Sequence, residues 1–90
     1  MELKDLKEKV KQFEKKAGFD KTNVKKLISM IQEELDILKK VKSKEKIDHQ
    51  LTDLLILIMQ ISWRKKTNFD KELKKWFKKS EKYHENKTKA

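Results

Sequence analysis

The sequence predicts an all-α fold, and three features indicate this. The chain has 90 residues, the size of one small domain, so we expect residues 1–90 to form a single domain. It has no proline and one glycine, and it is rich in lysine, glutamate and leucine, which favour helices. Its apolar residues recur every three or four positions, as in amphipathic helices. These patterns predict four helices, at about 2–17, 22–42, 46–65 and 69–85.

The first helix is predicted from a single apolar stripe. Its members lie three or four residues apart and are Leu3, Leu6, Val10, Phe13 and Ala17. Gly18 follows directly, and glycine commonly ends a helix because it adopts a left-handed backbone without steric cost. We therefore expect the helix to stop at about residue 17.

The second helix is predicted from capping residues followed by a broad apolar stripe. The candidate N-caps are Asp20, Thr22 and Asn23. The stripe comprises Val24, Leu27, Ile28, Ile31, Leu35 and Leu38, and it is widened by Met30, Ile37 and Val41. A polar run then breaks the pattern, and Ser43 within it is a candidate cap for the next helix.

The third helix carries a segment that is apolar on every side. Residues 54–59 read LLILIM, and a helix of this kind must be covered all round. Three short neighbours can hardly do this, so we expect a homodimer or tetramer with the second and third helices at the interface. The alternative is a monomer in which this helix is tightly enclosed. The segment is too short to span a bilayer, which needs about 20 apolar residues.

The fourth helix is expected to open with a capping box in the sequence TNFD, from Thr67 to Asp70. Its apolar side is predicted to consist of Leu73, Trp76, Phe77 and Tyr83. After about residue 84 we expect a frayed tail.

The charge and the cysteine count restrict the class of protein. The formal net charge is +10, which attracts polyanions, and residues 65–90 hold ten lysines against four acids. A basic helical protein that binds nucleic acid through its last helix is therefore one function hypothesis, and a merely solvated lysine surface is the alternative. The absence of cysteine excludes disulfides and thiolate zinc sites. The charged start of the chain is unlike a secretory signal, so we expect a cytoplasmic protein without a membrane partner.

Polar side chains on the second and third helices form a candidate metal site. Glu34 and Asp36 lie on the second helix, and Gln50 and Asp53 share one face of the third. Because a short connection makes successive helices antiparallel neighbours, we expect Glu34 and Asp53 to face each other across a cleft. Oxygen ligands of this kind suit Mg²⁺. The alternative is that such acids only complement a helix dipole, and that the neighbouring His49 is an ordinary polar side chain.

Three runs of the sequence together resemble the MazG-type all-α nucleotide pyrophosphohydrolases. They are FEKKAGFDKTNVKKLISMIQEELDIL, IDHQLTDLLILIMQIS and NFDKELKKWFKKSEKY, and the resemblance extends from about Leu6 to Tyr83. It implies a four-helix MazG-like bundle that hydrolyses a nucleoside triphosphate to the monophosphate and pyrophosphate. In this family Mg²⁺, which Mn²⁺ could replace, is bound by an E-x-x-E motif on one helix and an E-x-x-D motif on the next.

The resemblance assigns roles to individual residues. Glu34 and Asp53 match two of the four acids and would be the catalytic metal ligands. Ile37 stands at the position of the second acid and Gln50 at that of the third. Gln50 could still offer a neutral oxygen, and Asp36 could assist.

Two further points follow from the resemblance. Sliding the register by one residue would pair Glu33 with Asp36 instead, which fits the apolar positions less well. The replaced acids leave open a catalytically inactive MazG-like scaffold with a binding or regulatory role.

Four other residues are candidate nucleotide contacts. Phe19 could stack on a base, and its alternative role is packing. Lys21, Lys78 and Lys82 could contact phosphates, and their alternative is solvated surface.

Overall fold

The computed structural model describes the backbone of residues 2–88 and the side chains of residues 2–82. This part of the chain contains four helices: α1 (Leu3–Ala17), α2 (Val24–Lys40), α3 (Lys44–Arg64) and α4 (Phe69–Thr88). The predicted all-α fold with four helices is thus confirmed. The backbone of α4 is helical through Thr88, beyond the predicted start of a frayed tail, and the side chains of Tyr83 and His84 lie outside the described residues.

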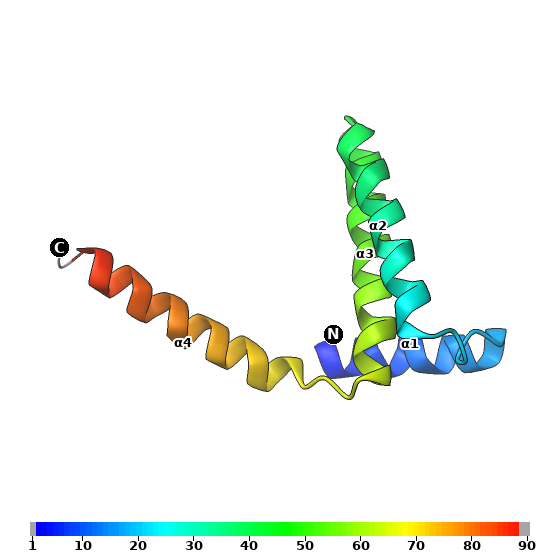
Figure 1. Cartoon of the computed structure of the whole chain (residues 1–90), viewed down its shortest axis with the longest axis horizontal. Coiled ribbons are helices and arrows are strands. Elements are labelled where there is room, and N and C mark those ends of the chain that lie inside the picture. Colours follow the sequence, from blue (N-terminus) through cyan, green and yellow to red (C-terminus); the bar gives the residue numbers. More distant parts are fainter. Residues whose placement is uncertain (1, 89–90) are drawn as a thin grey trace.

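The helices are arranged around a hairpin. α2 and α3 lie side by side and antiparallel, α1 crosses one end of this hairpin, and α4 leads away from the same end (Figure 1). Within the described residues, α3 packs against both α2 and α1, whereas α4 contacts α1. The molecule is therefore elongated, with extents of 53, 33 and 26 Å.

The connection between α1 and α2 begins and ends at residues that the sequence predicts. Gly18 has φ +80°, and its N–H donates to the carbonyl of Glu14, so the chain turns where the glycine predicts. Asn23 is the N-cap of α2, and its Oδ1 accepts a 2.8 Å hydrogen bond from the N–H of Lys26.

The other two connections also end in caps. The hydroxyl of Ser43 accepts a 3.3 Å hydrogen bond from the N–H of Lys46, which confirms the predicted cap of α3. At α4 the predicted capping box is wrong by one residue, because Asn68 rather than Thr67 provides the cap. Its Oδ1 accepts a 3.2 Å hydrogen bond from the N–H of Lys71. The carbonyl of Thr67 instead accepts a 2.9 Å hydrogen bond from the ammonium of Lys7 on α1.

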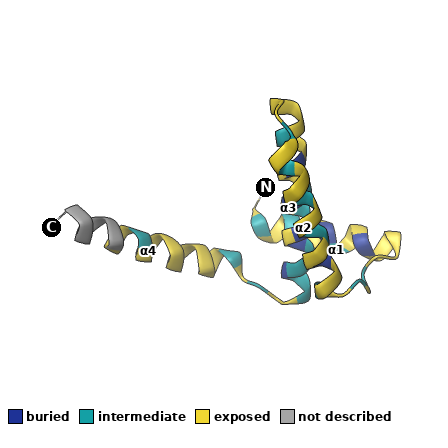
Figure 2. Cartoon of the chain, turned by 45° about the horizontal axis from the view of Figure 1, so that its top comes forward, coloured by how far each residue is buried: buried dark blue, intermediate teal, exposed yellow. Residues whose placement is uncertain are grey.

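The hydrophobic core is small and lies mainly where α1 crosses the hairpin (Figure 2). It consists of Val10, Leu27, Leu54, Leu57 and Met59. These residues come from three helices, so the core joins α1 to both halves of the hairpin.

Several residues of the predicted stripes are exposed instead of buried. On α1, Val10 and Glu14 face the core, and Phe13 is 63% exposed. On α2, Ile28 and Leu35 face outwards. The reason is geometric: α1 and α2 each pack mainly against α3, which covers one side of each stripe, and no other described part of the chain covers the rest.

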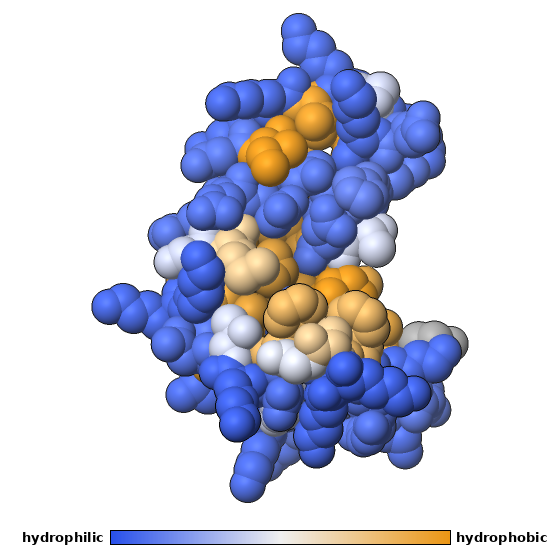
Figure 3. Space-filling view, turned by 90° about the vertical axis from the view of Figure 1, so that its right-hand side faces the viewer, coloured by the Kyte–Doolittle hydropathy of each residue, from blue (hydrophilic) through white to orange (hydrophobic). Residues whose placement is uncertain are grey.

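The all-round apolar segment of α3 is covered on some sides only. Leu54, Leu57 and Met59 are buried, and the remaining exposed apolar side chains lie along one face at Leu51, Leu55 and Ile58. Apolar surface also appears between hydrophilic margins on the face drawn in Figure 3. None of the described helices is long and apolar enough to cross a membrane.

The apolar side of α4 is exposed as well. Trp76 and Phe77 pack edge to face with their ring centroids 5.1 Å apart, but both are more than half exposed, and Leu73 beside them is 40% exposed. The predicted apolar side of α4 therefore exists as a face, without a cover in the described part of the chain.

Candidate functional site

The candidate site begins with a direct contact between α2 and α3. The amide nitrogen of Gln50 donates a 2.6 Å hydrogen bond to the carboxylate of Glu34 and a 3.3 Å hydrogen bond to its backbone carbonyl. Gln50 is buried and Glu34 is half-buried. The two helices are antiparallel neighbours, as the sequence predicts, and their short connection places Gln50 opposite Glu34.

Asp53 lies one helical turn beyond Gln50 on α3. Its carboxylate contacts His49, with 3.2 Å between Oδ2 and Nε2, and its side chain is 39% exposed. This contact of Asp53 lies within α3, and the α3 side chain that contacts Glu34 is Gln50 and not the predicted Asp53. His49 is 73% exposed and acts here as a surface partner of this acid.

The other acids of α2 point away from the contact with Gln50. Glu33 and Asp36 are both exposed, so the structure brings Glu34, and not the alternative pair, against α3. Ile37, at the position of an expected acid, lines an open crevice together with His49 and Gln50.

This arrangement offers few charged oxygens to a cation. Among the described residues, no three His, Cys, Asp or Glu side chains lie close enough together to hold a metal ion. Gln50 presents its N–H to Glu34, so its Oε1 would bind a cation there only after the amide turned. The chemistry available in one chain is therefore that of one carboxylate beside an amide, with a second carboxylate one turn away.

The predicted nucleotide contacts are not gathered around these acids. Phe19 and Lys21 lie in the connection before α2 and are exposed. Glu34 is ten residues into α2, about 15 Å along the axis from its start. Lys78 and Lys82 are exposed on α4, which contacts α1 and not the hairpin within the described residues.

A second polar cluster, missed by the sequence analysis, lies where α1 meets the end of α3. Glu14 is fully buried, and its carboxylate accepts hydrogen bonds from the guanidinium of Arg64 at 2.5 and 2.8 Å. The indole N–H of Trp63 donates a further 2.8 Å hydrogen bond to it. The guanidinium also stacks on the Trp63 ring, 4.4 Å from its centroid.

Arg64 uses all of its hydrogen-bonding capacity. Besides the two bonds to Glu14, it donates to three backbone carbonyls, those of Phe19, Thr22 and Gln60, at 2.8 to 3.0 Å. A guanidinium has five N–H donors, and each one is engaged. Arg64 therefore joins α1, the connection to α2 and the last turn of α3 in one contact.

The environment sets the charge state of Glu14. Burial by itself would raise the pKa of this carboxyl group, but hydrogen bonds from Arg64, Trp63 and Gln60 and the positive charge of Arg64 outweigh it and lower the pKa. Glu14 is therefore ionised at neutral pH. One signal in the sequence could have indicated this pair: Arg64 is the sole arginine among 25 basic residues, and arginine suits a buried, forked contact better than lysine does.

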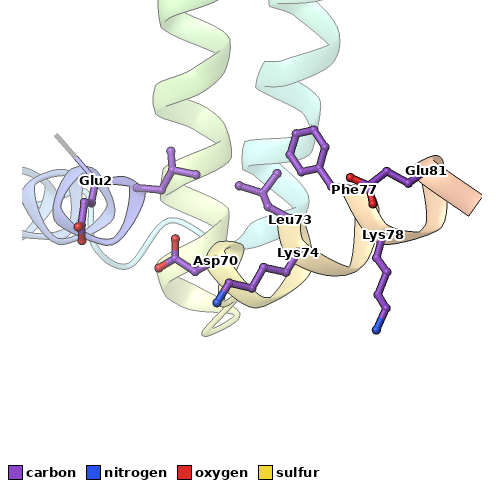
Figure 4. A pocket seen from close by; sticks show the side chains of 8 residues that line it. Glu2, Asp70, Leu73, Lys74, Phe77, Lys78 and Glu81 are labelled. Atoms are coloured by element: carbon purple, nitrogen blue, oxygen red, sulfur yellow. The ribbon is translucent and has the colours of Figure 1, made fainter.

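A crevice also opens between the start of α1 and α4. Glu2 and Leu3 lie on one side of it, and Leu73 and Phe77 lie on the other (Figure 4). Its lining mixes acids, lysines and apolar groups, so it presents no single charge to a ligand.

Comparisons of the chain with models of protein families, with curated proteins and with solved structures gave no match.

Proposed function

We propose that the protein is a MazG-like nucleotide pyrophosphohydrolase, which hydrolyses a nucleoside triphosphate to the monophosphate and pyrophosphate with Mg²⁺. The observation that carries this proposal is the contact of Glu34 with Gln50 across the hairpin, with Asp53 one turn away. These are the positions at which the resemblance expects acidic metal ligands. The order of the four helices also fits the resemblance.

The proposed roles of the residues follow from their chemistry. Glu34 and Asp53 supply anionic oxygens, the ligand type that Mg²⁺ prefers. Gln50 orients the Glu34 carboxylate through its N–H, and it would add a neutral oxygen after turning its amide. Bound Mg²⁺ would supply charge stabilisation at the phosphate and activation of the attacking water. Lys78 and Lys82 have no part in this proposal, because α4 does not approach the hairpin of its own chain.

The test is a turnover assay with the full chain. Each common ribo- and deoxyribonucleoside triphosphate is incubated with the protein and Mg²⁺ or Mn²⁺, and monophosphate and pyrophosphate are measured. We expect turnover with at least one nucleotide, and its loss in Asp53→Ala and Glu34→Gln. Helix content measured by circular dichroism should stay unchanged in both variants.

The matched control is Asp48→Asn, an exposed acid on the same helix that pairs with Lys44. This variant should retain full turnover. The variant Glu33→Gln tests the register, because a loss of turnover there would favour the Glu33 and Asp36 pair. Equal turnover in the wild type and in Asp53→Ala would refute the proposal.

A catalytically inactive scaffold is the second candidate, and one observation favours it. The Glu34 carboxylate already accepts a short hydrogen bond from a neutral amide, and Ile37 offers no ligand. Fewer charged ligands bind a hard cation less tightly. Titration calorimetry would separate the two candidates, since the scaffold should bind a nucleotide without requiring Mg²⁺, and tight Mg²⁺ binding by the wild type would count against it.

The proposal includes a homo-oligomer and a cytoplasmic location. One face of α3 is apolar and exposed, and it consists of Leu51, Leu55 and Ile58. These residues are each between 39% and 51% exposed, and a second copy of the chain would cover them. The location follows from the proposed substrate, because nucleoside triphosphates and Mg²⁺ are abundant in the cytoplasm.

A further inference from the structure

The inference concerns the lysines of α4, which form one continuous face. They are Lys71, Lys74, Lys75, Lys78, Lys79 and Lys82, and all six are exposed. At 100° per residue they occupy an arc of about 140° on the helix. No acid between Lys71 and Lys82 falls within this arc. Lys75, within the arc, contacts Glu72 at 3.6 Å in an exposed pair, and such a pair binds weakly. We call these six residues the lysine face.

The lysine face is separated from the apolar side of α4. On the same helical wheel its centre lies opposite the centre of the side formed by Phe69, Leu73, Trp76 and Phe77. Figure 4 shows this for one turn, where the Lys78 side chain extends away from Phe77 and Leu73. Acids lie at the borders between the two sides, namely Asp70, Glu72 and Glu81.

Such segregation is particular to α4. On α1 the exposed surface mixes Lys4 and Lys9 with Asp5 and Glu8, so positive and negative charges alternate. α4 also projects from the rest of the molecule, which leaves the lysine face open to a large partner (Figure 1). A solvated surface needs neither the segregation nor the projection.

We propose that the lysine face binds the phosphate backbone of nucleic acid without reading its sequence. From Lys71 to Lys82 the face extends about 16 Å along the helix axis. Successive phosphates of one strand are about 3.4 Å apart along a duplex axis, so this length matches about five of them. The face has no aromatic or amide side chain that could stack on a base or contact its edge, so charge is its means of recognition.

The same geometry argues against an anionic membrane surface. A helix that lies on a membrane buries its apolar side and needs cations at the borders of that side to reach the lipid headgroups. In α4 the borders carry acids, and the lysines lie on the far side. Insertion of Trp76 and Phe77 would therefore direct the lysine face away from the lipid.

The test measures binding of the full chain to labelled DNA and RNA oligonucleotides about twice as long as the lysine face. Fluorescence anisotropy is recorded for single strands and duplexes of several sequences over a range of salt concentrations. We expect similar affinities for different sequences and a linear fall of log affinity with log salt concentration. The triple variant Lys74→Gln, Lys78→Gln, Lys82→Gln should bind at least about tenfold more weakly, and its salt slope should be shallower by about 2 on single strands and by about 3 on duplexes.

The control variant changes the net charge equally at scattered exposed lysines, as Lys9→Gln, Lys25→Gln, Lys39→Gln. It should keep affinity within about twofold, because its lysines lie outside the face. Equal weakening of both variants would show that only net charge matters and would overturn the proposal. So would the absence of oligonucleotide binding at low salt, or binding confined to vesicles of phosphatidylcholine and phosphatidylserine in equal parts. Because the readout is binding, its outcome is independent of nucleotide turnover.

Discussion

At the scale of single residues, the most constrained contact is the pair of Glu14 and Arg64. Glu14 is fully buried, the Arg64 side chain is 9% exposed, and no buried side-chain nitrogen or oxygen among the described residues lacks a hydrogen-bond partner. A satisfied buried ion pair gives little net stability over an apolar pair, but removal of one partner leaves an uncompensated charge. The pair therefore specifies how α1 is attached to α3 more than it adds to stability.

The substitution Arg64→Met should lower the free energy of unfolding by about 3–5 kcal/mol, because Glu14 would stay buried without its partner. Arg64→Lys should recover part of this loss, since an ammonium has three donors where the guanidinium has five. Urea denaturation followed by circular dichroism measures both. Lys65→Met, at the exposed next position, is the control and should change little. A loss below about 1 kcal/mol in Arg64→Met would contradict this role.

The lowered pKa of Glu14 predicts a pH dependence of stability. Its contribution is complete above the ordinary pKa of 4.5 and is lost as pH falls through the lowered pKa of the folded state. The difference in unfolding free energy between the wild type and Glu14→Gln should therefore be constant near neutral pH and shrink in acid. Urea titrations of the two proteins at a series of pH values measure it. If the difference in unfolding free energy grew as pH fell, the pKa of Glu14 would be raised in the folded state, which would contradict the prediction.

At the scale of elements, each helix is delimited by local chemistry. Gly18 ends α1, and Asn23, Ser43 and Asn68 each accept a hydrogen bond at the start of a helix. These signals act over three or four residues, which is why the helices could be located from the sequence. The capping box at α4 was wrong because Thr67 and Asn68 are both good caps, and the turn before them decides which is used.

A substitution at Gly18 tests the backbone contribution alone. Apart from Gly18 itself and its two chain neighbours, no described atom lies within 4 Å of the position that a Cβ would take, so the cost of Gly18→Ala arises from φ +80° and not from a clash. We expect a loss of about 1 kcal/mol in unfolding free energy, and a smaller loss in Gly18→Asn, since asparagine tolerates this conformation better. Thermal denaturation of the two variants compares them. Equal losses would point to a side-chain effect instead.

At the scale of the whole molecule, the chain presents more apolar surface than one copy covers. Among the side chains that the structure describes, the core holds five buried apolar residues, whereas eleven large apolar side chains are exposed, among them Leu55 on α3 and Trp76 on α4. This imbalance supports the proposed homo-oligomer, because association removes apolar surface from water at about 25 cal/mol per Å².

Light scattering coupled to gel filtration tests the oligomer directly. The wild type should have a mass of two or more chains, and Leu55→Glu should have the mass of one chain, because a buried unpaired carboxylate opposes association. Thr52→Glu, an exposed position on another side of α3, should leave the mass unchanged. A monomeric wild type would contradict the expectation.

The candidate site shows what could be predicted and what could not. The antiparallel pairing of α2 with α3 could be predicted from their short connection, but the residue predicted opposite Glu34 was Asp53, and the structure places Gln50 there. The contact of Asp53 with His49 could not be predicted, because a carboxylate near the surface can pair with side chains on its own helix or on the neighbouring helix. The burial of Glu14 was not predicted, since one charged residue beside an apolar stripe does not show which way the helix is turned.

The sequence by itself determined the helices, their order and their approximate ends, because hydrophobic periodicity, capping residues and the glycine after α1 act locally. The tertiary structure decided which side of each helix is buried, because this depends on where α1 crosses the hairpin. It turned Glu14 inwards and Phe13 outwards, and it left both the apolar side and the lysine face of α4 open. These outcomes depend on contacts between residues far apart in the sequence, such as Glu14 and Arg64, which are 50 positions apart and which no local pattern contains.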